Sequence, residues 1–182
     1  MPLHLLLSLL TGGDRRSIGR SPVVVGRVLR RPKLLQVLVQ GLSAADPLVR
    51  MRAADALEKV SVPLRSQLRR YVPRLLRLAK EASEQELQWH LSQVLPRLAL
   101  SPKQRTEARR IFRGYLASRS SIVQAMAVEA LVQLAPDSRA GRQAVVRLLA
   151  EASCSPRAAV RARARRLGRA VSRPSRGSLR VE

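Results

Sequence analysis

The sequence predicts an all-α solenoid of repeated helix pairs, and three observations lead to this fold class. A pattern of three apolar residues recurs at a nearly constant interval along the chain. No stretch alternates apolar and polar residues with the period of two that marks a half-buried strand. Aromatic residues make up only 2% of the sequence, so Leu, Val, Ile and Ala must fill the core, which suits closely packed helices better than a β-sandwich.

The recurring pattern spaces its apolar residues at i, i+4 and i+8, which places them on one face of a helix. The first residues of its four occurrences are 38, 36 and 37 residues apart and are Val49, Leu87, Val123 and Val160. The fourth occurrence ends on Gly168, which breaks the pattern. These segments predict the second helix of each pair, at residues 46–57, 84–95, 120–131 and 156–168.

Another helix is predicted before each of these, which makes the repeating unit a helix, a turn and a helix. The predicted first helices cover residues 33–42, 63–82, 102–117 and 139–152. Pro63 and Pro102 suit the first position of a helix, and Ser101 is a predicted N-cap. Asp46 and Ser155, each followed by a proline, give the same signal for two of the second helices.

The ends of the chain differ from its repeated middle. Helices predicted over 1–11 and 22–31 form an N-terminal helical cap, which we assign to residues 1–32. The repeats occupy residues 33–171. Residues 172–182 are rich in Arg, Ser and Pro, which predicts a disordered basic tail.

Residues 46–57, Asp-Pro-Leu-Val-Arg-Met-Arg-Ala-Ala-Asp-Ala-Leu, resemble the HEAT-repeat signature, and the three later segments match it less closely. The chain is also similar to small bacterial HEAT-repeat proteins of unassigned function, and that match includes Gly13–Ser17. The resemblance implies a right-handed α-solenoid of about four HEAT-like helix pairs plus an N-terminal helical cap. HEAT proteins act as curved interaction platforms, so it also implies a non-enzymatic scaffold for protein–protein interaction.

In solenoids of this type the second helices line the concave face, and equivalent positions on them predict a protein-binding surface. Its predicted residues are Arg52, Asp55, Lys59, His90, Gln93, Arg97, Met126 and Glu129. Their mixed charge counts against a continuous groove for a phosphate backbone, so we expect a protein partner. Arg50 and Arg161 also occupy equivalent positions, and both are predicted to make structural bonds to an acid or a helix end in a neighbouring repeat.

The charge balance leads to an alternative function. Lys and Arg number 35 against 12 Asp and Glu, a formal net charge of +23, which favours a nucleic-acid or other polyanion partner, although coding bias would also enrich arginine. A ladder of arginines is predicted on the convex first helices, at Arg70, Arg74, Arg77, Arg110, Arg113 and Arg147. The basic C-terminal helix adds Arg161, Arg163, Arg165, Arg166 and Arg169. With so few aromatics, such binding would be sequence-independent contact with the DNA or RNA backbone; either set could instead be a solvated face.

Enzymatic chemistry has little support in the sequence. His4 and His90 are far apart, and the single Cys154 excludes an intrachain disulfide and a cysteine zinc site. The Gly12–Ser17 segment lacks the spacing of a phosphate-binding loop and is predicted to be a turn. We therefore expect no cofactor, no metal and no catalytic residue, with a glycosylase-like enzyme as the weakest alternative. The apolar run at 3–10 is too short for a membrane span, and a cytoplasmic protein is expected.

Overall fold

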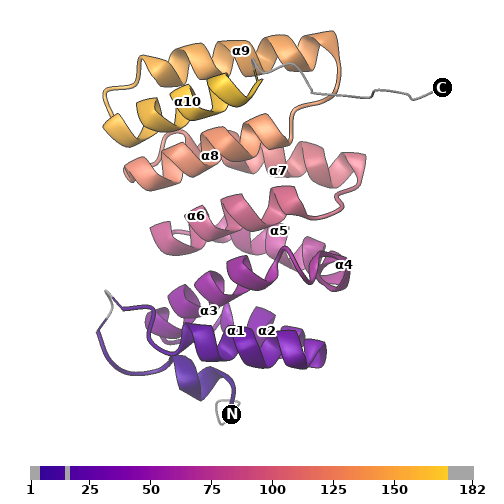
Figure 1. Ribbon diagram of the computed structural model, residues 1–182, viewed down its shortest axis with the longest axis vertical. Coiled ribbons are helices and arrows are strands. Elements are labelled where there is room, and N and C mark those ends of the chain that lie inside the picture. The colour runs from indigo at the N-terminus through magenta and orange to yellow at the C-terminus, as the bar shows by residue number, and fades with distance from the viewer. Residues whose placement is uncertain (1–4, 15–16, 172–182) are drawn as a thin grey trace, which may run out of the picture.

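The computed structural model describes residues 5–14 and 17–171, and this part of the chain is helical, without strands (Figure 1). The helices follow one another along the long axis, with the N-terminal helices at one end and the C-terminal helices at the other. The predicted all-α class is therefore confirmed for the described residues. No helix among them is long and apolar enough to cross a membrane. The predicted tail at 172–182 lies outside the described residues.

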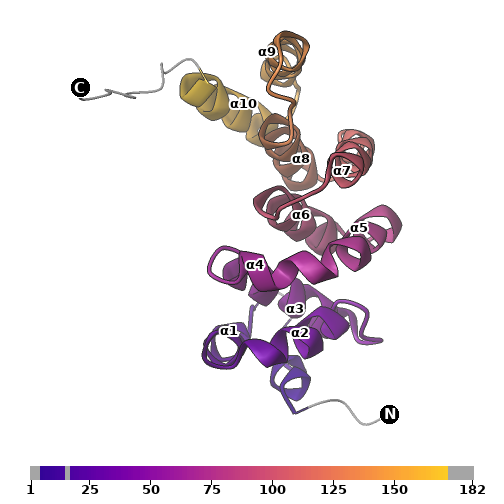
Figure 2. The ribbon, with the colours of Figure 1, turned by 90° about the vertical axis from the view of Figure 1, so that its right-hand side faces the viewer.

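The helices form two layers along this axis (Figure 2). The second-helix layer, in which each helix contacts the next, contains α1 (Ser21–Arg30), α3 (Pro47–Val60), α6 (Gln85–Val94), α8 (Ser121–Gln133) and α10 (Ala158–Val171). The first-helix layer contains α2 (Leu35–Gly41), α5 (Val72–Glu81), α7 (Pro102–Tyr115) and α9 (Arg139–Ser153). Each helix of the first-helix layer packs against the second helix that follows it in the chain, so the apolar core lies between the layers.

Shorter elements mark the places where the sequence prediction was wrong. The remaining described elements are η1 (Leu7–Leu10), η2 (Pro32–Leu34), α4 (Arg65–Leu68), η3 (Arg69–Tyr71) and η4 (Leu95–Arg97). The single helix predicted over 63–82 is divided into α4, η3 and α5. Pro73 explains the break, because proline has no N–H and its ring clashes with the carbonyl four residues earlier. It is therefore accommodated in the first turn of a new helix. Pro63, predicted at a helix start, lies in the turn before α4.

The predicted N-terminal helix over 1–11 is also wrong for the residues described, because only the short 3-10 helix η1 forms there. Two of the predicted caps are confirmed. The Asp46 side chain accepts a 2.8 Å hydrogen bond from the backbone N–H two residues later, and Ser101 forms a reciprocal capping box with Gln104. Ser155 instead caps a turn before α10, where its hydroxyl accepts from the N–H of Arg157 at 3.2 Å.

A long polar side chain closes the turn between the two helices in each of four pairs. It comes from the same position of each second helix and donates to the backbone carbonyl six residues earlier. The bonds join Arg50 to Ala44, Gln88 to Ala82, Gln124 to Ser118 and Arg161 to Ser155, at 2.6 to 2.8 Å. Carbonyls at the end of a helix lack a partner within that helix, and these side chains supply one. The predicted bond to a neighbouring helix pair is confirmed for Arg50, which also reaches Glu84, whereas Arg161 bonds, among the described residues, only to the turn of its own pair.

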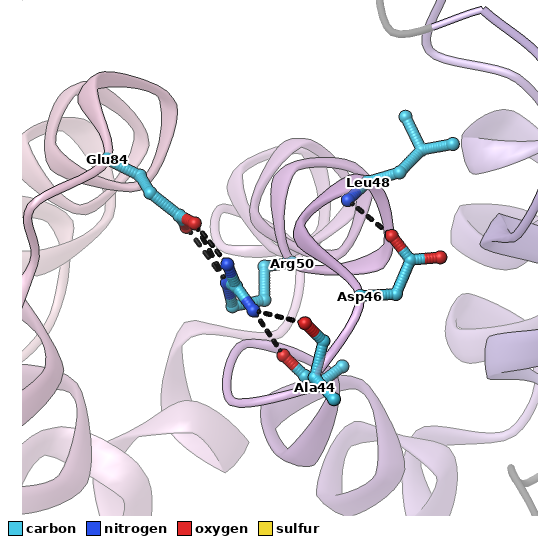
Figure 3. Close-up of polar contacts among 6 residues, drawn as sticks. Ala44, Asp46, Leu48, Arg50 and Glu84 are labelled. Atoms are coloured by element: carbon cyan, nitrogen blue, oxygen red, sulfur yellow. Dashed lines mark hydrogen bonds and ion pairs between the residues drawn. The ribbon is translucent and has the colours of Figure 1, made fainter.

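Arg50 also connects one helix pair to the next (Figure 3). Its Nε lies 2.9 and 3.1 Å from the carboxylate oxygens of Glu84, and its Nη2 makes a further ion pair with the same group. Its Nη1 donates to the carbonyls of Ala44 and Ala45. The hydrogen bond to Glu84 raises the pKa of Arg50. One guanidinium therefore holds the turn before α3 and the start of α6 together.

Replacing Arg50 with methionine should lower the free energy of unfolding by about 2–4 kcal/mol, because the change removes the guanidinium that donates to Glu84 and to two turn carbonyls. Urea denaturation of the purified protein measures this. Arg142→Met is the matched control, since its ion pair with Asp137 is exposed and should contribute less than about 1 kcal/mol. Equal losses in the two variants would contradict a structural role for the Arg50 bonds.

Candidate binding surfaces

The predicted protein-binding residues of the second-helix layer are largely occupied by bonds within the protein. Asp55 is 9% exposed and accepts hydrogen bonds from Ser21 and from Lys59, whose Nζ lies 2.7 Å away. Arg97 makes an ion pair of 2.8 Å with Glu58 of the preceding second helix. These acids and bases neutralise one another, so less of this face is available to a partner than the sequence predicts. Gln93 and Met126, two further predicted residues, are half-buried and form no such bond.

The same holds where α8 meets α10. Glu129 forms ion pairs with Arg163 and with Arg166, the latter at 2.9 Å. Arg161 is bonded to the turn carbonyl of Ser155. Three of the five arginines predicted to bind a polyanion on this helix therefore have internal partners. The two that are exposed and make no polar bond with a described residue are Arg165 and Arg169.

The expectation that Arg52 lies on an open concave face is wrong. Its side chain is only 2% exposed. The guanidinium donates to the backbone carbonyls of Leu10, Gly12, Asp14 and Ser17 at 2.7 to 3.0 Å. The loop between η1 and α1 covers this end of the second-helix layer and takes up the donors of Arg52. Arg52 therefore organises the N-terminal segment and is not available to a partner.

Glycines allow the loop to approach Arg52 so closely. Gly12, Gly13 and Gly19 have φ values of 69°, 78° and 52°, in the left-handed region that other residues rarely adopt. A Cβ atom on Gly19 would lie 2.8 Å from the Cζ of Arg52. The predicted turn is confirmed over the described residues of this loop. The glycines serve backbone conformation and close contact with the guanidinium.

His90 is a second predicted surface residue that the structure buries, with 8% exposure. It lies on α6 beside Trp89, with 5.3 Å between the ring centroids. Both rings line a hollow of about 620 Å³ between α3, α6 and the N-terminal loop. Burial lowers the pKa of His90, because a desolvated imidazole disfavours its charged form. Its Nδ1 has no hydrogen-bond partner among the described residues. His90 is thus a neutral packing residue at neutral pH.

The first-helix layer presents the opposite picture, because five of its six predicted ladder arginines are exposed and only Arg74 is half-buried. α5, α7 and α9 bury their apolar side chains toward the second helices and place arginines on the outward positions. Four of these are exposed and make no hydrogen bond or ion pair with any described residue, namely Arg77, Arg110, Arg113 and Arg147. Arg70 lies over the Tyr71 ring, 4.9 Å from its centroid, and Arg74 contacts the Ser43 hydroxyl at 3.4 Å. Glu107 and Glu151 lie on the same helices but form no ion pair with those four arginines.

A groove of about 470 Å³ runs between α7 and α9, within this ladder. Its apolar lining includes Leu131 and Val145, each 8% exposed, and the half-buried Leu116 and Leu148. The arginines that line it are Arg109, Arg113 and Arg147. Neither this groove nor the place of Arg109 at its edge is evident in the amino-acid sequence, because a gap between two helices leaves no signal in the periodicity of either one. The surface combines guanidinium donors with apolar side chains, which can bind anionic and apolar groups together.

The described residues contain no group of three or more His, Cys, Asp or Glu side chains that could hold a metal ion. No protein-family model and no curated protein matches the sequence. Among solved structures, the chain is similar to a crystal structure of an engineered protein, with a TM-score of 0.58 and 20% sequence identity. The likeness covers 88% of this chain and 75% of the engineered one. At this identity the likeness concerns the fold alone.

Arg52→Lys should release the N-terminal loop, because an ammonium group cannot reproduce the fork of donors that serves four separate carbonyls. We expect hydrogen exchange to accelerate at residues 10–14 and 17–19 and the free energy of unfolding to fall by about 2–3 kcal/mol. Arg77→Lys, an exposed exchange of the same kind, is the control. Unchanged protection of the loop in Arg52→Lys would contradict its assignment as the organiser of this segment.

His90 should make the protein less stable in mild acid. Because its folded pKa lies below the ordinary value of about 6.5, the unfolded chain takes up the proton first as the pH falls. The resulting loss in the free energy of unfolding is absent above about pH 7.5 and grows as the pH is lowered toward 5. In His90→Gln, the free energy of unfolding, measured by denaturation at each pH, should lack this part of the pH dependence. If His90→Gln keeps the pH dependence of the natural protein, burial of the His90 imidazole is not its cause.

Proposed function

We propose that this protein is a non-enzymatic binding scaffold, built as a right-handed α-solenoid of HEAT-type helix pairs, that binds an acidic protein partner through its first-helix layer. One observation carries the proposal: the charged side chains of the second-helix layer pair with one another, whereas the arginines of the first-helix layer do not. On the second-helix layer Asp55, Glu58 and Glu129 are bonded to basic side chains of the same protein. On the first-helix layer the arginines of the ladder lack acidic partners among the described residues.

The repeat architecture has two supports. The apolar pattern recurs at 36 to 38 residues, an interval typical of helical-pair repeats. The same side-chain bond closes the turn of four helix pairs. Repeats that contact only their neighbours form extended surfaces, and such surfaces serve binding more often than chemistry.

The proposed binding face differs from the one that the sequence predicts. A partner on the second-helix layer would have to displace existing ion pairs such as Arg97–Glu58 and Arg163–Glu129. Arg113 and Arg147 have no such bonds to lose, so a carboxylate that pairs with them gains the full interaction. The charge of the first-helix layer therefore favours carboxylate-rich partners.

Nucleic acid is the second candidate, and the exposed Arg165 and Arg169 on α10 are the observation that favours it. Phosphate contacts require only cations and would use α10 and the ladder together. An apolar lining contributes nothing to such contacts. Because the ladder borders a groove lined by leucine and valine, we place an acidic protein before nucleic acid.

The test compares binding of poly-glutamate and of duplex DNA over a series of salt concentrations. The variant Arg77→Gln/Arg110→Gln/Arg113→Gln/Arg147→Gln should bind poly-glutamate at least about tenfold more weakly than the natural protein. A control with the same loss of charge elsewhere, Arg20→Gln/Arg30→Gln/Arg165→Gln/Arg169→Gln, should bind almost as well as the natural protein.

Equal losses in the two variants would mean that only net charge attracts poly-glutamate, and the proposed face would be wrong. Tighter binding of DNA than of poly-glutamate, with a steep dependence on salt that the control variant reduces, would establish the nucleic-acid candidate instead.

A further inference from the structure

We infer that the groove between α7 and α9 receives an amphipathic helix of the acidic partner, whose apolar stripe enters the groove and whose flanking carboxylates pair with the arginines at its rim. This inference rests on the proposed function and specifies which segment of the partner docks and where. Three properties of the groove carry it: its position between two cores, its apolar lining and its charged rim.

The groove lies where the apolar core of the protein is divided. One core cluster extends from η1 to α8, and a second joins α8, α9 and α10. α7 packs against α5 and α8, whereas α9 packs against α8 and α10. Leu116 and Leu148 border both clusters and are only partly buried. α7 and α9 therefore leave apolar surface uncovered between them. The neighbouring first helices α5 and α7, by contrast, pack directly against each other.

The lining of the groove is preformed. Leu131 and Val145 form part of it at 8% exposure each, so both are already held by the surrounding packing. Gly141 contributes backbone at the start of α9, where a Cβ atom would lie 2.0 Å from the carbonyl oxygen of Pro136. The loop before α9 is thus in close contact with the helix that follows it. A volume of about 470 Å³ lies in the range of preformed binding cavities and accepts side chains of a docked segment.

The rim is cationic on both sides. Arg109 and Arg113 lie one helical turn apart on α7, and Arg147 lies on α9. The Nη2 of Arg109 is 3.4 Å from the hydroxyl of Thr106, a neutral partner, and Arg113 and Arg147 have no polar partner among the described residues. Glu151 is the one acid that lines the groove. A docked segment therefore meets three cations and one anion.

This combination selects an amphipathic acidic helix. A helix places apolar residues at i, i+3, i+4 and i+7 on one stripe and polar residues on either side of it. Such a stripe fits a groove between two helices, and glutamates beside it reach arginines on both walls. Arginine at the edge of an apolar contact is the usual composition of a strong protein interface. A phosphate backbone would engage the rim and leave the lining uncovered.

The experiment selects ligands for the purified full-length protein from a displayed library of amphipathic helices of about four turns. The polar positions of the library vary among Glu, Gln and Lys, and the apolar positions vary between Leu and Ser. We expect selection to enrich Glu at the positions that flank the stripe and Leu within it. A peptide chosen this way should bind at least about tenfold more weakly to Arg113→Gln/Arg147→Gln than to the matched control Arg20→Gln/Arg30→Gln, which removes two exposed arginines far from the groove.

The decisive variant is Ala144→Arg, which fills the groove with a long side chain and adds a positive charge. It should weaken the selected peptide by at least about tenfold while duplex DNA binds as well as before. Ala140→Arg, at an exposed position of the same lining, provides a second variant that cannot disturb the core.

Each other outcome overturns the inference in a distinguishable way. In one outcome, the selected peptides bind Ala144→Arg and Ala140→Arg normally but lose affinity for Arg113→Gln/Arg147→Gln. Acidic ligands then bind the ladder outside the groove, so the docking site in the groove is wrong and the proposed function stands. If no acidic sequence is enriched, the inference and the proposed function both fail. If only DNA binds, and binds Arg113→Gln/Arg147→Gln more weakly, the ladder binds the phosphates of nucleic acid, and the inference and the proposed function both fail.

Discussion

The hydrogen bond from each second helix to the turn carbonyl six residues earlier is the contact on which the rest of the stack depends. It occurs in four pairs, with arginine in the first and last and glutamine between them. It ties the turn to the second helix and so restrains the connection between the two helices of a pair, while the buried apolar faces of the first helices set which side faces outward. Arg50 extends the same function to the next pair through Glu84.

The sequence predicts the helices well where the interactions are local. The apolar spacing locates the second helices, and Asp46 and Ser101 mark two helix starts that the structure confirms. The failures have a common physical cause in interactions that the spacing does not contain. Pro73 divides a segment whose apolar pattern continues through it. Arg52 has the periodicity of a surface residue, yet a loop some 40 residues earlier in the chain folds over it. Periodicity assigns a face to a residue but does not show what covers that face.

Net charge proves a poor measure of the surface that can bind. Arg52, Arg97 and Arg163 contribute to the excess of positive charge, but each is committed to carbonyls or carboxylates of the same protein. The first-helix ladder differs because its positions face outward from helices whose partners lie on the other side. The distinction between a structural arginine and an available one is set by neighbours in space. A candidate site is therefore better located from the arginines that lack internal partners than from the total number of arginines in the sequence.

The groove places the proposed ligand where it would act on the protein as well as bind to it. α8 belongs to both core clusters and is the only described helix that packs extensively against both α7 and α9. In a stack where each unit contacts only its neighbours, stability is a sum of units and of the interfaces between them. A partner helix bound between α7 and α9 would cover the apolar lining of the groove and so add an interface between these two helices. Any ligand that binds the folded state preferentially stabilises it, so occupancy of the groove would strengthen the attachment of α9 and α10 to the preceding pairs.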